Sequence, residues 1–264
     1  MKTNIIAVIN QKGGVGKTTT VINLAASLSI LGQNNLVIDL DPQGNATTGL
    51  GKSNNDDDNN IYNLLINKIN LKDGLQKTDI TNLDVFGSNV NLSGLEVETA
   101  NDENRAFILK DILNKNSEII KKYDNVFIDC PPSLSLLTIM ALVSANEILV
   151  PLQTEFFALE GITQLVKTID RIKIKLNPSL SVRGILLTMF DKRNKLSSQV
   201  DKEARNYFKQ KVYQSVIPRN VRLSEAPSHG QPCVIYDKSC SGSKAYLKLA
   251  EEFLNQRKNI GSAA

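Results

Sequence analysis

The chain has 264 residues, a hydrophobic fraction of 41% and a formal net charge of +4, values typical of a soluble globular protein large enough for one full domain. It contains no run of about 18 apolar residues and no signal-peptide pattern, which argues against a membrane-spanning or secreted protein and predicts a cytoplasmic one. Three cysteines, Cys130, Cys233 and Cys240, form no CxxC pair, so we expect small buried side chains rather than a zinc site or a disulfide framework.

The charge is unevenly distributed along the chain. Residues 1–150 contain 12 lysines and arginines against 17 acidic residues, whereas residues 151–264 contain 19 against 10. Part of the acidic excess is the run Asp56–Asp58, inside a polar stretch, Ser53–Asn60, that we interpret as a surface loop. The basic second half indicates a polyanionic partner, although solvated basic helix faces would produce some of the same excess.

Short apolar runs alternate with helical patterns. The predicted strands are Ile5–Ile9, Asn35–Asp39, Leu83–Phe86, Asn125–Asp129, Glu147–Pro151, Ser181–Thr188 and Val212–Val216. The predicted helices, with apolar residues recurring every three or four positions, are Thr18–Leu31, Arg105–Lys122, Leu134–Val143, Ala158–Leu176, Ser198–Lys209 and Ser243–Gln256. This alternation predicts an α/β fold, a mostly parallel twisted sheet with helices on both faces. No linker or repeat divides the chain, so we expect residues 1–264 to form a single domain.

The first predicted strand runs into a glycine-rich loop with the sequence KGGVGKTT. Glycine lacks the Cβ that would keep the backbone from wrapping a polyphosphate, and the N–H groups of the loop and of the following helix converge on the anion. Lys17 is placed to reach the β- and γ-phosphates, and the Thr18 hydroxyl is placed to bind Mg²⁺. The predicted nucleotide-binding residues of the loop are Lys12, Gly13, Gly14, Val15, Gly16, Lys17, Thr18 and Thr19.

This loop departs from the ordinary phosphate-binding pattern at one position and adds a lysine at another. The strict pattern requires a glycine five residues before Gly16, where this chain has Gln11. The additional lysine, Lys12, is either part of the site or an ordinary surface residue.

Two predicted strands end in acidic residues at the same sheet edge as the loop. Asp129 closes an apolar run in the Walker B arrangement, in which the carboxylate contacts Mg²⁺ directly or through water. Asp41, in the segment DLDPQGN, can orient an attacking water or hold Mg²⁺ through its hydration shell. Asp39 lies deeper and is expected to support the site. The predicted metal ligands are Thr18, Asp41 and Asp129; the alternative role of Asp129 is a helix or turn cap.

KGGVGKTT, DLDPQGN and IDCPP together resemble the ParA/Soj chromosome-partitioning ATPases of the ParA/MinD superfamily, whose deviant Walker A loop has its signature lysine at the position of Lys12. The resemblance continues through Glu155–Gly161 and Ile217–Gly230 and extends from residue 4 to about residue 255. It implies a P-loop ATPase that forms a homodimer with ATP, in which Lys12 reaches the partner's phosphates. It further implies that Pro218 and Asn220 meet the adenine. The predicted catalytic residues are Lys12, Lys17 and Asp41.

The same resemblance implies that the ATP-bound dimer binds double-stranded DNA without sequence specificity, associates with the nucleoid, and segregates chromosome or plasmid origins with a ParB-like partner that stimulates hydrolysis. Basic residues of the second half are the candidate DNA contacts, because phosphate contacts give affinity without reading sequence. They are Arg193, Arg219, Arg222, Lys244 and Lys248. One arginine of the pair Arg219 and Arg222 could instead be a structural ion-pair partner, for instance of Glu225. We expect Arg222 to contribute more, with Arg219 partly structural.

Three other functions are considered. A MinD-like membrane-cycling ATPase would need a C-terminal amphipathic helix, whereas residues 253–264 are polar and Leu247, Ala250 and Leu254 form a narrow docking stripe. A metallocluster ATPase would need cluster-binding cysteines. A ParA-type protein that positions another cargo over the nucleoid stays open. The first predicted strand begins so early that no N-terminal helix-turn-helix domain is expected.

Overall fold

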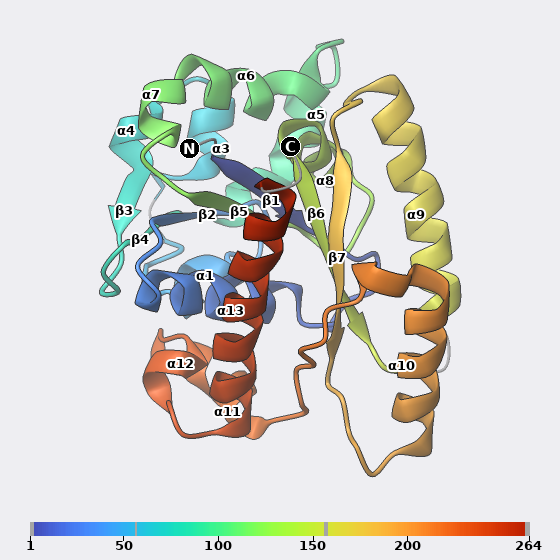
Figure 1. Cartoon of the computed structure of the whole chain (residues 1–264). Coiled ribbons are helices and arrows are strands. Elements are labelled where there is room, and N and C mark those ends of the chain that lie inside the picture. The colour runs from blue at the N-terminus through green and yellow to red at the C-terminus, as the bar shows by residue number, and fades with distance from the viewer. Residues whose placement is uncertain (1–2, 56, 156–157, 262–264) are drawn as a thin grey trace.

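Figure 1 shows the computed structural model, which describes residues 3–55, 57–155 and 158–261. A seven-stranded sheet, with the order β3-β4-β2-β5-β1-β6-β7, lies between two layers of helices. Every neighbouring pair is parallel except β3 and β4. The strands are β1 Asn4–Val8, β2 Asn35–Asp39, β3 Leu75–Lys77, β4 Leu83–Phe86, β5 Asn125–Asp129, β6 Glu147–Gln153 and β7 Ser181–Thr188.

The α-helices are α1 Lys17–Ile30, α2 Asn45–Gly49, α3 Ile61–Leu65, α4 Leu71–Gly74, α5 Leu95–Glu98, α6 Ile108–Lys115, α7 Ser117–Ile120, α8 Leu136–Ser144, α9 Ala158–Lys175, α10 Lys195–Phe208, α11 Val221–Glu225, α12 Cys233–Tyr236 and α13 Ser241–Gly261. Short 3₁₀ segments are η1 Val90–Gly94, η2 Arg105–Phe107, η3 Lys209–Lys211 and η4 Ala226–His229. In the described part of the chain, no helix is both long enough and apolar enough to span a membrane.

The central strands are buried on both faces, as their uninterrupted apolar runs predict. Along β1, Ile6 and Val8 belong to the core under α1 and α13, whereas Ala7 belongs to the core under α6, α8 and α9. The long helix α13 packs against α1 and brings the C-terminal part of the chain next to the glycine-rich loop (Figure 1). The predicted α/β fold with one parallel sheet is therefore confirmed.

The predicted boundaries of β2, β4, β5 and β7 agree with the structure to the residue. The predicted strand Val212–Val216 is wrong. Only Val212 forms an isolated bridge to β7, and the amides of Gln214 and Ser215 donate instead to the carboxylate of Glu252, at 2.7 and 2.8 Å. Glu252 of α13 thus takes two amides of this segment, while the Tyr213 amide still donates to the Ile185 carbonyl of β7 at 3.0 Å.

The predicted helix Arg105–Lys122 is broken into η2, α6 and α7. The break falls at Asn116, whose side chain and backbone N–H both donate to the carbonyl of Ile112, at 2.9 and 3.1 Å. Competition of this kind is typical of asparagine and ends α6. Asp56 of the acidic run, Phe156 and Phe157 of a resembling segment, and the predicted polar tail beyond residue 261 lie outside the described residues.

Candidate functional site

The site lies at the carboxyl edge of the sheet, where β1, β5 and β2 are neighbours. Val8 at the end of β1 is opposite Asp129, and Asp129 is opposite Asp39 at the end of β2. Because parallel strands end at one edge, the loop after β1, the acid of β5 and the acidic segment after β2 meet in space. The fold brings together the loop residues and the three carboxylates that the sequence selected.

Backbone geometry explains the glycines of the loop. Gly14 and Gly16 have φ of +73° and +90°, in the left-handed region that glycine adopts without a Cβ penalty. The carbonyl of Val15 accepts a hydrogen bond from the Thr188 hydroxyl at 2.8 Å, which ties the loop to the end of β7. Gly16 then precedes α1, so the first turn of the helix points its free N–H groups into the loop.

Lys17 and Lys12 have different surroundings. The Lys17 side chain is only 7% exposed, and its Nζ donates to the carbonyl of Lys12 at 3.3 Å, across the loop. Burial lowers the pKa of Lys17, and the nearby charge of Asp129 opposes that shift. In contrast, the Nζ of Lys12 pairs with the carboxylate of Glu155 outside the loop, and about half of each side chain is exposed.

Asp129 is completely buried, and neither of its carboxylate oxygens has a hydrogen-bond partner among the described residues. Burial, followed by the charge of Asp39, raises the pKa of Asp129 far above the ordinary carboxyl value, while the Thr18 hydroxyl acts in the opposite direction. An unsatisfied buried carboxylate is costly unless a cation or a donor balances it. A hard divalent cation such as Mg²⁺ fits this oxygen donor, together with Thr18 and Asp41. A capping role for Asp129 is excluded among the described residues, because no backbone amide there donates to its carboxylate oxygens.

Asp39 holds the segment that carries Asp41. Its carboxylate accepts hydrogen bonds from the Thr47 amide, the Thr47 hydroxyl and the Asp41 amide, at 2.8, 2.7 and 3.2 Å. Complete burial is the largest cause that raises the pKa of Asp39 to about 6. Asp41 accepts from the Gln43 amide at 3.0 Å and is only 7% exposed. Asp39 therefore supports the position of Asp41, as its depth in the strand predicts.

A small cavity of about 110 Å³ adjoins the start of α1. Gly16 and Thr19 form one side of it, and Pro218, Asn220 and their neighbours form the other. Asn220 is fixed by two hydrogen bonds: its Oδ1 accepts from the Arg222 amide at 2.9 Å, and its Nδ2 donates to the Ser241 hydroxyl at 2.8 Å. The location fits a base attached to phosphates in the loop, which supports the role that the resemblance implies for Pro218 and Asn220.

Sequence reasoning missed the rest of this cavity wall. The missed residues are Thr188, Met189, Ile217, Arg219, Leu223, Ser224 and Tyr246. Ile217, Arg219, Leu223 and Ser224 lie within the resembling segment Ile217–Gly230, although only Pro218 and Asn220 of that segment were assigned to the nucleotide. Thr188, Met189 and Tyr246 carry no local pattern, because only tertiary packing brings β7 and α13 beside the loop.

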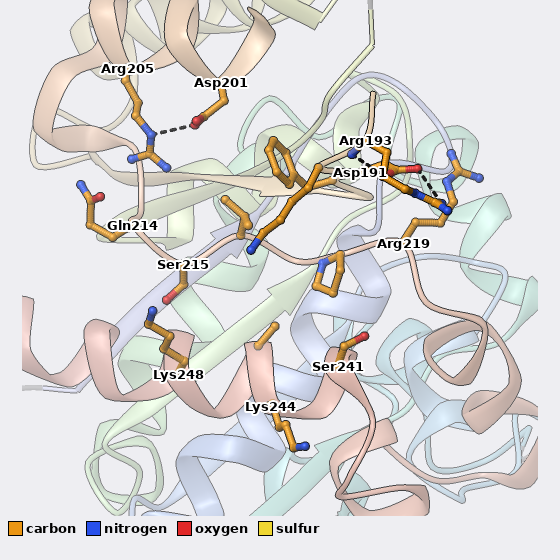
Figure 2. A pocket seen from close by; sticks show the side chains of 15 residues that line it. Asp191, Arg193, Asp201, Arg205, Gln214, Ser215, Arg219, Ser241, Lys244 and Lys248 are labelled. Carbon is orange, nitrogen blue, oxygen red and sulfur yellow. Dashed lines mark hydrogen bonds and ion pairs between the residues drawn. The ribbon is translucent and has the colours of Figure 1, made fainter. Parts of the chain in front are cut away.

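A basic groove lies between α10, α13 and the segments after β7 (Figure 2). Its volume is about 840 Å³. It contains four of the five predicted DNA contacts, Arg193, Arg219, Lys244 and Lys248, together with Lys192 and Arg205, which the sequence did not single out. Two of its cations are paired with acids inside the groove: Arg193 with Asp191 at 3.2 Å, and Arg205 with Asp201 at 2.7 Å. The hydrogen bond from Arg193 is the largest cause that lowers the pKa of Asp191.

The fifth predicted contact, Arg222, does not line the groove. Its guanidinium pairs with Glu225 at 2.7 Å and lies 3.5 Å from the carboxylate of Asp237. The described residues contain no ion pair of Arg219. The ion-paired arginine is therefore Arg222, the reverse of what we expected from the sequence.

Comparison with known proteins assigns the chain to a family. The sequence model of a family described as AAA domain matches residues 3–182. The chromosome partitioning protein ParA of Caulobacter vibrioides (strain NA1000 / CB15N) is 48% identical over 258 residues, which cover 97% of this chain and 95% of that protein. The chain belongs to the ParA/Soj family of chromosome-partitioning proteins. The sporulation initiation inhibitor protein Soj of Bacillus subtilis (strain 168) is 47% identical, with coverage of 94% of this chain and 97% of the relative.

A solved structure extends the similarity from sequence to fold. Cobyrinic acid a,c-diamide synthase from Mycobacterium smegmatis, with bound ADP and magnesium, has a TM-score of 0.83 and 32% sequence identity, covering 97% of this chain and 96% of that chain. That protein holds a magnesium nucleotide on the same fold. In this ParA/Soj family member, the glycine-rich loop, the buried Lys17 and the buried Asp129 lie at the carboxyl edge of the sheet. Nucleotides bind at this edge in open α/β sheets.

Proposed function

We propose that this ParA/Soj family member hydrolyses ATP to ADP and phosphate with Mg²⁺, forms a homodimer with ATP, and in that state binds double-stranded DNA without sequence specificity. With a ParB-like partner that stimulates hydrolysis, the cycle segregates chromosome or plasmid origins in the cytoplasm, over the nucleoid. ATP builds the DNA-bound dimer and hydrolysis releases it.

The observation that carries the ATPase proposal is the completely buried Asp129 carboxylate without a hydrogen-bond partner among the described residues, close to Lys17. When bound, ATP and Mg²⁺ supply the γ-phosphoryl group and the charge that balances this carboxylate. Thr18, Asp41 and Asp129 would hold the metal ion. Lys17 neutralises the β- and γ-phosphates, and Asp41 orients the attacking water.

The pairing of Lys12 is compatible with a role in a partner's site. The ion pair with Glu155 is about half exposed on both sides, and pairs of this kind contribute at most about 1 kcal/mol. Exchanging Glu155 for the phosphates of a second protomer therefore costs little. Beside those phosphates, the Lys12 ammonium would stabilise the negative charge that develops during phosphoryl transfer.

The basic groove supports the DNA proposal and links it to the nucleotide. Pro218 and Arg219 line both the groove and the small cavity beside α1, so one segment forms a wall of each. A nucleotide in the cavity would therefore bear on the position of Arg219 in the groove. Exposed lysines and arginines give sequence-independent affinity for phosphates.

The proposal is tested with one preparation, two binding partners and two nucleotides. The purified chain is mixed with random-sequence duplex DNA, or with vesicles containing anionic lipid, in the presence of ATP or ADP with Mg²⁺. We expect the protein to dimerise and to bind DNA with ATP but not with ADP. We expect no co-sedimentation with vesicles in either case. Equal DNA binding with ADP would contradict the proposed cycle, and ATP-dependent vesicle binding would favour the MinD-like alternative. Against that alternative, Leu249, Ala250 and Phe253 of α13 are buried in the core, so that this face of the helix is not available to a membrane.

A further inference from the structure

Two of the three cysteines are in direct contact. The Sγ atoms of Cys233, at the start of α12, and Cys240, just before α13, lie 3.4 Å apart, and both are free thiols. The sequence pointed to small buried side chains at both positions, and that is correct for Cys233 but not for Cys240, which is partly exposed. A disulfide needs sulfurs about 2.05 Å apart, so a small movement of one thiol would close the bond.

The surroundings make the two thiols unequal. Cys240 precedes the 21-residue helix α13, and its sulfur accepts a hydrogen bond from the Ser243 amide at 3.4 Å, with the Ser243 hydroxyl 3.3 Å away. Partial burial opposes ionisation of Cys240, but hydrogen bonds from Ser243 and Cys233 outweigh it and lower the pKa of Cys240 below the ordinary thiol value. Burial raises the pKa of Cys233 to about 11. Thiolates at helix N-termini are the reactive ones.

We propose that Cys240 and Cys233 form a site of reversible oxidation, in which a peroxide converts the thiol pair into an intramolecular disulfide. The Cys240 thiolate attacks one peroxide oxygen; an S–O bond forms, the O–O bond breaks, and the leaving oxygen takes up a proton. The sulfur of Cys233 then attacks the sulfenic sulfur of Cys240. The S–S bond forms, the S–O bond breaks, and water leaves with the Cys233 proton. Two sulfurs are oxidised, one peroxide is reduced to two waters, and a small thiol reverses the change.

The turn between the two cysteines, and the residue after Cys240, contact Arg222 and Asn220. The Asp237 carboxylate accepts from the amides of Ser239 and Cys240, at 3.0 and 3.1 Å, and lies 3.5 Å from Nε of Arg222. Ser241, the residue after Cys240, accepts the hydrogen bond from Asn220. Closing the disulfide therefore moves residues that hold Arg222 and Asn220. The oxidation itself does not depend on the proposed function.

The test is peptide mapping of the full chain after treatment with hydrogen peroxide and alkylation of the remaining thiols. Trypsin cleaves after Arg222, Lys238 and Lys244, so Cys233 and Cys240 fall in separate peptides, 223–238 and 239–244. We expect the two peptides to appear linked, two hydrogen atoms lighter than their sum, and to separate after dithiothreitol. If both peptides stay fully alkylated in wild type at peroxide levels that oxidise free glutathione, the proposal is wrong.

Three variants assign the roles. In Cys233→Ser, Cys240 should stop at the sulfenic acid, which dimedone labels. In Cys240→Ser, Cys233 should remain an unmodified thiol, because it is buried and largely protonated. Cys130→Ser is the matched control, since Cys130 is buried elsewhere, and it should form the link as wild type does. Dimedone labelling of Cys233 rather than Cys240 would overturn the assignment of the attacking thiol.

Discussion

Lys12 lies in the glycine-rich loop and Lys17 begins α1 directly after it, but only Lys17 is buried beside the carboxylates. We predict that Lys17→Ala abolishes nucleotide binding, because the β- and γ-phosphates lose their cation. Lys12→Ala should still bind ATP as a monomer, with turnover reduced by a factor of about 10²–10³, as when one preorganised donor is removed. Titration with a fluorescent ATP analogue and phosphate release measure the two effects.

The matched control for this pair of lysines is Glu155→Gln, which breaks the ion pair but keeps Lys12. If the ion pair has no catalytic role, this variant should hydrolyse ATP at least as fast as wild type. Normal dimerisation and turnover of Lys12→Ala would contradict the assignment of Lys12 as the signature lysine.

The Asp41 amide donates to Asp39, and the Asp41 carboxylate accepts from the Gln43 amide. Removal of the Asp41 carboxylate should affect ATP hydrolysis more than ATP binding. We predict that Asp41→Ala binds ATP with Mg²⁺ but hydrolyses it very slowly, since the water loses the group that orients it. The protein should then accumulate as a dimer, seen as a persistent peak in size-exclusion chromatography with ATP. The exposed Asp111→Ala serves as control. A monomer peak with undiminished phosphate release would remove Asp41 from the catalytic set.

The buried Asp129 should destabilise the protein when nucleotide and metal are removed. We predict that Asp129→Asn increases the free energy of unfolding at pH 7 by about 1–3 kcal/mol in the presence of a chelator, because a buried unpaired charge is lost. The same variant should lose magnesium-dependent turnover. Urea unfolding measures the first effect, with Asp111→Asn as control.

The pH dependence of the free energy of unfolding follows from the direction in which the pKa values of Asp129 and Asp39 are shifted. The pKa values of Asp129 and Asp39 are raised in the folded protein, Asp39 to about 6. A group with a raised pKa contributes stability that is present below its unfolded pKa and is lost as the pH rises through the folded pKa. The nucleotide-free wild type should therefore be more stable near pH 5 than near pH 7, with a smaller difference in Asp129→Asn. A larger difference in the variant would contradict the assignment.

Residues inside contiguous motifs could be predicted from the sequence, because adjacent positions on one loop or strand end share a location. This holds for Lys17, Thr18 and Asp129. The partner of Arg222 could be proposed from its spacing to Glu225, but the choice between Arg219 and Arg222 required the groove to be seen. The contact between Cys233 and Cys240 also depends on a turn that no motif announces.

At the scale of elements, α13 is the piece that joins the C-terminal residues to the sheet. Phe253 is completely buried, with its ring 6.1 Å from that of Phe127 and the Arg183 guanidinium 3.6 Å above it. We predict that Phe253→Ala lowers the free energy of unfolding by about 3–5 kcal/mol. Lys248→Ala, on the exposed side of the same helix, should change it by less than about 0.5 kcal/mol. Equal losses measured by urea unfolding would show that α13 is not docked in this way.

Elements with strong periodicity were predictable, and elements fixed by single side chains were not. The strands β2, β4, β5 and β7 follow directly from buried apolar runs. In contrast, the segment 212–216 has the composition of a strand, yet the amides of Gln214 and Ser215 donate to the carboxylate of Glu252. The short antiparallel β3 is only three residues long and carries no readable pattern. In the segment 212–216, hydrogen bonds to a distant side chain therefore override the local strand propensity.

For the whole molecule, the decisive arrangement is that the proposed nucleotide cavity and the basic groove share Pro218 and Arg219. Figure 2 shows Arg219 in the groove. The acidic first half of the chain supplies Asp41 and Asp129, the proposed metal ligands, and the second half supplies every basic residue of the groove. Part of the charge asymmetry in the sequence thus lies in two adjacent sites. A dimer would contain two copies of the groove, one on each protomer.

DNA binding should therefore require ATP, ignore sequence and weaken steeply with salt. If a dimer neutralises about 4–6 phosphates, the logarithm of the binding constant should fall against the logarithm of the salt concentration with a slope of about −4 to −5. Arg219→Glu and Lys248→Glu should remove most of the binding and flatten the slope, because each reverses a groove charge twice per dimer. Arg222→Glu should have a smaller effect, since Arg222 is paired with Glu225 and lies outside the groove.

The measurement is a titration of random-sequence duplex over a range of KCl, with ATP and with ADP, for wild type and each variant. Lys115→Glu makes the same charge change on the exposed surface of α6, outside the groove, and should bind as wild type does apart from a small general loss. ATP-dependent dimerisation, followed by size-exclusion chromatography, should be intact in Lys248→Glu, so that a loss of binding reports the groove and not the dimer. If Lys115→Glu and Lys248→Glu weaken binding equally, the effect comes from net charge alone. The groove would then not be the DNA surface, and the basic second half would need another polyanionic partner.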